Sequence, residues 1–319
     1  DADQTTGSGD VRMLADVDII LGGTVSTTGA VSLITNTGTI YDGDIDGTVD
    51  IDATDLRIKA GTGAGELGVS VDPIETTVAT VSAHAGAGGI NLLESDTLTV
   101  RDTSVTVNRV AEDAEVSGVT DAIQSDLITT DGSGGSIVLR STAGDITLND
   151  GTAPDDDGAI SADGAGNVLI EAIEAARSVT ANADIESEGG NVSVLAGNSV
   201  EFTGGADIET VGSGTIDLEA TGGSITLSNS SDQAAVSGDI RLYAGENITL
   251  GGTASTGGSV SVTSDLGWIL DGDTDGSVDI EADGLRLDAE VGAGQLGAGA
   301  DPIETTVATV SAHAGAGGI

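Results

Sequence analysis

Two short acidic stretches carry the pattern of residues in this sequence that is best suited to chemistry. Each reads D-x-D-x-D-G, and the second lies 229 positions after the first. Calcium takes six to eight oxygen ligands, and three aspartates at alternate positions before a glycine bend can converge on one ion. An aspartate shortly after the bend adds a fourth carboxylate. The sequence therefore predicts a metal site in each stretch, with calcium as the candidate ion. The candidate ligands are Asp42, Asp44, Asp46 and Asp50 in the first stretch and Asp271, Asp273, Asp275 and Asp279 in the second.

The same pattern is also typical of an acidic, solvated corner, because Asp-Gly is a common turn pair. If Val49 and Ile51 face the interior, Asp50 and Asp52 on the same strand face solvent. The glutamate expected at position 12 of an EF-hand loop is replaced by Ala53, and tandem glycine-rich calcium nonapeptides are absent from the sequence. A solvated corner therefore stays open as the alternative to a calcium site.

Other residue types argue against catalysis. His84 and His313 occupy one position in two copies of a repeated stretch, and alternation with the neighbouring alanines places both histidines on the outer surface. The carboxylates are spread along the chain, Lys59 is the only lysine, and no nucleophile stands beside a base in the sequence. We therefore expect a non-enzymatic protein without catalytic or cofactor-binding residues, the candidate calcium ligands apart.

The acidic stretches belong to a long internal repeat. Residues 1–90 align with residues 230–319 without a gap, and 55 of the 90 positions are identical. The last 19 positions, 72–90 and 301–319, match letter for letter. A fixed period of this kind predicts an array in which each unit packs mainly on its neighbours. We therefore expect one continuous domain over residues 1–319, with an internal repeat whose period is 229 positions.

A finer pattern recurs inside the unit, in which a glycine precedes a β-branched residue by two positions and an alternating apolar pair follows. Alternation with period two indicates strands with one buried face, and the glycines indicate tight corners. The first apolar positions recur at close to regular steps, at Val192, Ile216, Ile240, Val260 and Val278. Three short strands in about twenty residues predict an all-β fold, a right-handed parallel β-helix of roughly sixteen coils and about 75 Å.

Two segments depart from this pattern. Asp72, Pro73 and Glu75 fit the start of a helix, so we expect at most one or two helical turns at that corner. Residues 110–131 lack the glycine anchors, and they predict a loop or short helix that leaves the rod.

The charge balance limits the partners of the chain. Nine basic residues against 53 acidic ones give a net charge of −44, which excludes nucleic acid as a partner. Along the predicted rod this charge is about as dense as that of duplex DNA, so the surface should condense cations. No apolar run is long enough for a membrane helix. The sequence contains no cysteine and does not begin with methionine, and we expect a piece of a longer, exported protein.

The glycine-anchored steps resemble the haemagglutination repeats of filamentous haemagglutinin-like bacterial surface proteins. The stretch PIETTVATVSAHAGAGGINLLESDTLTV at residues 73–100 is similar to a module of giant repetitive bacterial exoproteins. The resemblance covers most of the chain apart from residues 110–131. It implies a right-handed β-helix, an extracellular or cell-surface location on a bacterium, and a role in adhesion or as an extracellular fibre.

The expected function is therefore structural, as a segment of a secreted or cell-surface β-helical fibre or adhesin stalk with a cation-binding acidic surface. Its partners would be neighbouring repeats or other copies met end to end, or a glycan on a host or cell surface. Two alternatives stay open. The first is a calcium-dependent carbohydrate-binding adhesin module, and the second is a polysaccharide-active β-helix enzyme.

Overall fold

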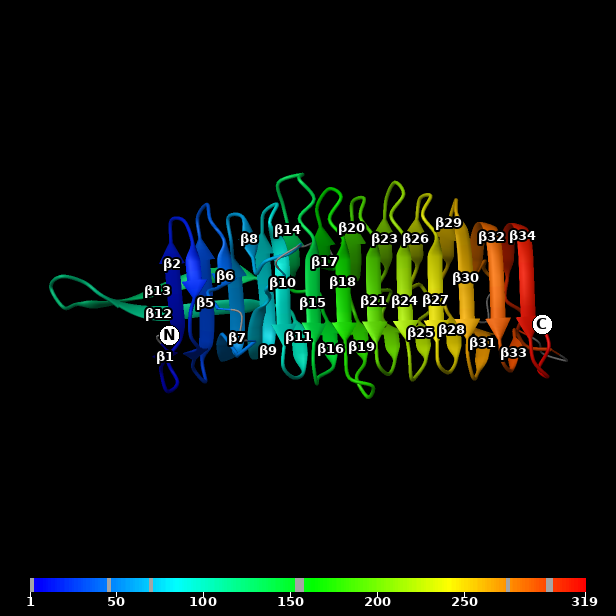
Figure 1. Cartoon of the computed structure of the whole chain (residues 1–319), viewed down its shortest axis with the longest axis horizontal. Coiled ribbons are helices and arrows are strands. Elements are labelled where there is room, and N and C mark those ends of the chain that lie inside the picture. The colour runs from blue at the N-terminus through cyan, green and yellow to red at the C-terminus, as the bar shows by residue number, and fades with distance from the viewer. Residues whose placement is uncertain (1–2, 45–46, 69–70, 153–157, 274–275, 297–300) are drawn as a thin grey trace.

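The computed structural model describes residues 3–44, 47–68, 71–152, 158–273, 276–296 and 301–319, and their regular structure is all β-strand. The strands lie side by side along one elongated body, with the two ends of the chain at opposite ends of it (Figure 1). Within these described ranges, thirty-two strands form one sheet whose pairs are parallel, and two more form a separate antiparallel sheet. The described residues include no helix with the length and apolar character that crossing a membrane requires.

The strands of the large sheet fall before and after the antiparallel pair. The earlier strands are β1 (Gln4–Thr5), β2 (Val11–Ala15), β3 (Ile19–Leu21), β4 (Val25–Ser26), β5 (Ala30–Thr35), β6 (Ile40–Asp42), β7 (Ile51–Lys59), β8 (Gly63–Ala64), β9 (Ile74–Ala85), β10 (Gly89–Glu94) and β11 (Leu98–Val100). The later strands are β14 (Leu127–Thr129), β15 (Ile137–Ser141), β16 (Ile146–Leu148), β17 (Gly158–Ala162), β18 (Val168–Ala172), β19 (Val179–Ala181), β20 (Asp184–Ser187), β21 (Val192–Ala196), β22 (Val200–Phe202), β23 (Ile208–Thr210), β24 (Ile216–Ala220), β25 (Ile225–Leu227), β26 (Gln233–Ala235), β27 (Ile240–Ala244), β28 (Ile248–Leu250), β29 (Ala254–Thr256), β30 (Ser259–Ser264), β31 (Trp268–Asp271), β32 (Ile280–Ala289), β33 (Gly292–Ala293) and β34 (Thr305–Ala314).

Each strand from β14 to β29 pairs in parallel with the strand three places later, so three ladders run along the body. Four successive partners in one ladder are residues that the sequence spacing predicted. They are Val192, Ile216, Ile240 and Val260. The next partner of Val260 is Leu285 and not Val278, because Val278 belongs to the second acidic corner and precedes β32. This all-β arrangement of parallel ladders is consistent with a solenoid.

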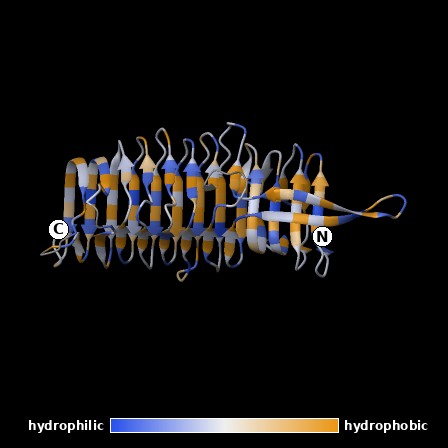
Figure 2. Cartoon of the chain, turned by 180° about the vertical axis from the view of Figure 1, so that it is seen from behind, coloured by the Kyte–Doolittle hydropathy of each residue, from blue (hydrophilic) through white to orange (hydrophobic). Residues whose placement is uncertain are grey.

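The core lies on the inner face of the ladders. In β21, Val192, Val194 and Ala196 are buried, whereas Ser193 and Leu195 between them are half-buried. Figure 2 shows the same alternation as hydrophobic and hydrophilic bands that follow one another along the strands. Period-two sequences therefore form strands here because each turn of the chain can bury one face against its neighbours.

Close packing between successive strands explains the glycine that precedes each first apolar residue. A Cβ atom on Gly238 would collide with the carbonyl oxygen of Gly214, and a Cβ on Gly214 would collide with that of Gly190. The Gly190 oxygen also accepts a hydrogen bond of 2.7 Å from Thr210 Oγ1. Only glycine has room at this corner, which is why the motif in the sequence marked the strands so well.

Between β11 and β14 the chain leaves the large sheet as an antiparallel hairpin, β12 (Thr103–Val110) and β13 (Val116–Gln124). This hairpin runs back over β2, β5, β7 and β9, and its tip extends past the N-terminal end of the sheet (Figure 1). Part of residues 110–131 therefore leaves the large sheet, as predicted, but as the end of β12, a turn and β13, and not as a loop or short helix. Val105 and Val107 occupy alternate positions of β12, and β-branched residues at this spacing favour a strand.

The predicted helix start at residues 72–75 was also wrong. Asp72 forms an isolated antiparallel bridge with Glu66, and β9 begins at Ile74. The β-branched run that follows Glu75 continues as a single long strand, which pairs with β7 on one side and with β10, β11 and β14 on the other. A helix would crowd these side chains, whereas the parallel ladders accommodate them.

Candidate metal centre

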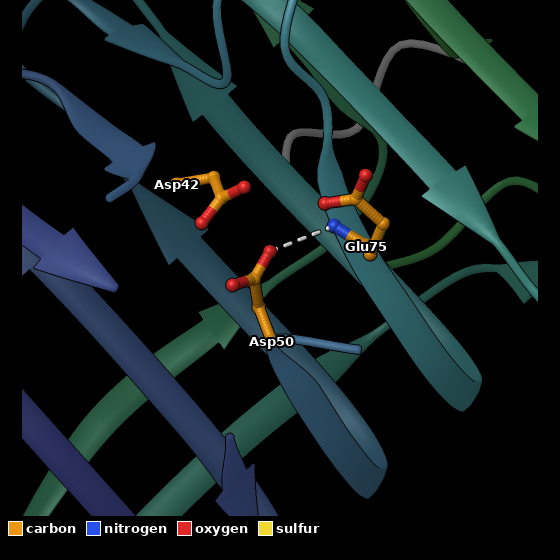
Figure 3. Close-up of side chains that lie close together, drawn as sticks. All are labelled: Asp42, Asp50 and Glu75. Atoms are coloured by element: carbon orange, nitrogen blue, oxygen red, sulfur yellow. Dashed lines mark hydrogen bonds between the residues drawn. The ribbon is translucent and has the colours of Figure 1, made fainter. Parts of the chain in front are cut away.

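Three carboxylates converge at the first acidic corner. Asp42 ends β6, Asp50 directly precedes β7, and Glu75 is the second residue of β9. All three side chains are buried, and each offers an oxygen within 4.8 Å of the oxygens of the other two. Figure 3 shows them facing one another across the corner. Calcium–oxygen distances are about 2.3–2.6 Å, so one ion between these oxygens can contact all of them.

Backbone hydrogen bonds fix this geometry. The Asp50 amide donates to the Glu75 carbonyl oxygen at 2.9 Å. The Glu75 amide in turn donates to Asp50 Oδ2 at 3.0 Å, the bond drawn in Figure 3. This reciprocal pair joins two neighbouring strands of the ladder. On the other side of the corner, the Asp44 amide donates to Asp42 Oδ1 at 3.1 Å, which folds the chain around the Asp42 carboxylate.

The second copy of the repeat builds the same corner from Asp271, Asp279 and Glu304. The Glu304 amide donates to Asp279 Oδ2 at 2.7 Å, and the Asp279 amide donates to the Glu304 carbonyl oxygen at 2.9 Å. The Asp273 amide donates to Asp271 Oδ1 at 2.9 Å. Each bond matches one in the first corner, so the arrangement is a property of the repeat.

The corners hold their carboxyl groups in an unfavourable electrostatic environment. Burial, with the nearby charge of Asp42, raises the pKa of Asp50 to about 8. Burial, with the nearby charge of Asp271, raises the pKa of Asp279 to about 7. The pKa values of Glu75 and Asp271 are also raised, first by burial and then by neighbouring carboxylates. At neutral pH such a cluster requires either retained protons or a cation to offset the repulsion.

Several carboxylate oxygens in these corners have no hydrogen-bond donor among the described residues. They are Glu75 Oε2 in the first corner and Asp271 Oδ2 and Glu304 Oε2 in the second. Leaving a buried anionic oxygen unpaired is costly. Below about pH 8, a proton held by Asp50 and donated to Glu75 relieves the first corner. A divalent cation relieves it without protonation.

The candidate ligands predicted from the sequence divide into three groups. The triads contain Asp42 and Asp50 in the first corner and Asp271 and Asp279 in the second. The groups of converging carboxylates among the described residues do not include Asp44 and Asp273, whose backbone amides bond to the first aspartate of each corner. Asp46 and Asp275 lie outside the described residues.

The sequence prediction was wrong about the direction of Asp50. Asp52 is exposed, but Asp50 is buried because it precedes the strand and belongs to the corner. Glu75 was missed as a ligand because it was assigned to a helix start, and its counterpart Glu304 was missed with it. The available signal was that each lies in the stretch repeated letter for letter, before a β-branched run that favours a strand.

The two histidines have different surroundings. His313 is exposed, with Nδ1 3.1 Å from Asp288 Oδ1, in line with the predicted surface position. His84 is half-buried, and its Nε2 lies 2.9 Å from the carbonyl oxygen of Ser125, where the chain returns from the hairpin. The expectation of a solvated His84 was therefore wrong, because the hairpin covers this side of the first copy.

Comparisons of the chain with protein-family models, with curated protein sequences and with solved structures found no match.

Proposed function

We propose that this chain is a structural segment of a long secreted or cell-surface β-helical fibre or adhesin stalk, in which bound calcium holds neighbouring turns together at the acidic corners. The chain is a right-handed, three-sided parallel β-helix in this proposal. Parallel crossovers are almost always right-handed, which sets the hand. Ladder partners such as Val192 and Ile216, or Val260 and Leu285, lie more than twenty positions apart. We therefore expect fewer coils than the roughly sixteen that a uniform step of about twenty predicts.

The observation that carries the proposal is the recurrence of one corner, with the same hydrogen bonds, in both copies of the repeat. A catalytic site requires only one set of catalytic residues in a protein. A feature that returns with every unit belongs instead to the construction of the array. The ligands of the first corner lie in β6, directly before β7 and in β9. Those of the second lie in β31 and directly before β32 and β34, so an ion at either corner would link successive turns.

The acidic surface fits the same role. A net charge of −44 keeps such rods apart laterally and attracts cations. The unpaired oxygens at the corners then favour a bound ion over diffuse screening, because diffuse counterions cannot reach buried atoms.

Immunogold electron microscopy of the source cells, with antibody raised against this chain, tests the proposed function. Gold along thin filaments or stalks that extend from the cell supports it. Gold confined to the cell interior contradicts it. Gold restricted to points of contact with other cells favours a carbohydrate-binding adhesin module, which glycan arrays with and without calcium would then examine.

A further inference from the structure

The hairpin β12–β13 covers one outer face of the first copy and is held there by specific bonds. Arg12 Nε donates to both carboxylate oxygens of Asp121 at 2.9 Å, and Arg57 Nε donates to the Ala122 carbonyl oxygen at 3.2 Å. The Thr106 amide donates to Asp10 Oδ2 at 3.1 Å. Further along the hairpin, Gln124 Nε2 donates to the Ile58 carbonyl oxygen at 2.7 Å and to Ser82 Oγ at 3.2 Å.

The second copy carries the same receiving residues on β27, β30, β32 and β34, but no hairpin covers them in the described part of the chain. Asp239, Arg241, Arg286 and Ser311 stand 229 positions after Asp10, Arg12, Arg57 and Ser82. In the alignment before the identical stretch, only 36 of 71 positions are the same. Asp10, Arg12 and Arg57, whose side chains bind the hairpin, are all among the positions that are identical in the two copies.

The second copy leaves free the atoms that hold the hairpin in the first. Arg241 uses Nη1 for Asp217 and Glu219, and Arg286 uses Nη1 and Nη2 for Thr263 and Asp288. In both arginines the Nε–H has no acceptor among the described residues, whereas the Nε–H of Arg12 and of Arg57 binds the hairpin.

Burial differs between the copies in the same way. The Arg12 side chain is 14% exposed and that of Arg241 is 44% exposed. Arg57 is buried, whereas 54% of the Arg286 side chain is exposed. Ser32 under the hairpin is fully buried, and its counterpart Ser261 is partly exposed. The second face therefore carries the side chains that receive the hairpin in the first copy, and here they are exposed to solvent.

We propose that the outer face of β27, β30, β32 and β34 is the docking surface for the hairpin of a further copy of this repeat unit. Each unit then reaches back and locks a hairpin onto its own first turns, and the aspartate that corresponds to Asp121 binds Arg241. This inference rests on the repeated rod of the proposed function but is independent of calcium binding. An array of such units is reinforced by one lateral clamp per repeat, in addition to the strand ladders.

Cysteine alkylation can test this proposal cleanly because the chain contains no cysteine. Single-cysteine variants Ser32→Cys and Ser261→Cys are made in the 319-residue chain. The same two variants are made in a chain extended after Ile319 by a second copy of residues 91–229. Extension should slow alkylation of Ser261→Cys at least about tenfold and leave Ser32→Cys as protected as before. Hydrogen exchange of the appended strands shows that the extension has folded.

Two results would overturn the proposal. One is unchanged alkylation of Ser261→Cys in an extended chain whose appended strands resist hydrogen exchange. The other comes from the original chain without any extension. There, Asp121→Ala or replacement of residues 103–124 by a short turn should speed the alkylation of Ser32→Cys. If Ser32→Cys stays protected in both variants, the hairpin is not what covers this face. Asp121→Ala placed only in the appended hairpin is the matched control, and it should restore alkylation of Ser261→Cys.

Discussion

The two copies of the repeat agree at their inner corners and differ on their outer face. Both bring two aspartates and one glutamate together through the same backbone bonds. Only the first copy has a hairpin over it within the described residues, and the side chains it covers are buried there and exposed in the second. Each copy therefore forms the corner from its own residues, whereas the outer face is buried only where a hairpin packs over it.

The largest expected effect concerns the covered face. Asp121→Ala removes the partner of Arg12, and both side chains are largely withdrawn from solvent. Breaking a buried ion pair from one side typically costs about 3 kcal/mol, so hydrogen exchange of β12 and β13 should show hairpin opening easier by roughly that amount.

Asp217→Ala is the control in the second copy, because it removes a partner of Arg241 at an exposed site. This substitution should lower the free energy of unfolding by less than about 1 kcal/mol. If Asp121→Ala and Asp217→Ala lower stability equally, the hairpin does not stabilise the first copy.

Asp50→Asn should change stability in opposite directions with and without calcium. In chelator at pH 8 the amide removes a repelled, buried charge and still accepts the hydrogen bond from the Glu75 amide, so the melting temperature should rise. With calcium at a hundred times its Kd, the intact corner gains about 2.7 kcal/mol, which the variant loses.

Asp52→Asn is the matched control for this prediction, since Asp52 is exposed on the adjoining strand. Its melting temperature should follow the parent chain in both conditions. The same sign of effect for Asp50→Asn in chelator and in calcium would contradict a cation at the corner.

The pH dependence of stability should show the cost of the corners directly. An unfolded aspartate has a pKa of about 3.9, whereas the folded pKa values of Asp50 and Asp279 are about 8 and about 7. Between these limits the folded chain binds more protons than the unfolded chain, so stability in chelator falls as pH rises from about 4 to 8.

Saturating calcium should flatten this pH profile, because the ion replaces the protons. Thermal melts across the pH range, with and without chelator, measure both profiles. A stability in chelator that rises over this range would contradict the predicted sign.

The smallest expected effect contrasts the histidines. His84→Ala removes a half-buried contact with the Ser125 carbonyl oxygen and should cost about 1 kcal/mol. His313→Ala alters an exposed side chain and should stay within about 0.5 kcal/mol. Urea-gradient hydrogen exchange of β9 and β34 gives both values. If His313→Ala lowers stability as much as His84→Ala does, the hairpin over the first copy has no effect on the contribution of His84.

Local rules were enough for the strands and failed where distant segments meet. Close contact between successive turns requires a glycine before Ile216 and before Ile240, so the positions of these strands could be predicted from the sequence. Glu75 reaches the corner only through the register between β7 and β9, which no local pattern around residue 75 contains. The hairpin lacked the glycine anchors, although the alternation at Val105 and Val107 in β12 was present in the sequence.

Calorimetric titration of calcium into the chelator-treated chain at pH 8 tests the central claim most directly, that the corners are cation sites that join turns of a rod. We predict saturable binding of one ion per corner, hence two per chain, one in Asp50→Asn and none in the double variant Asp50→Asn with Asp279→Asn. Binding that never saturates, or a stoichiometry that these substitutions leave unchanged, would contradict the claim and leave only diffuse screening of the acidic surface.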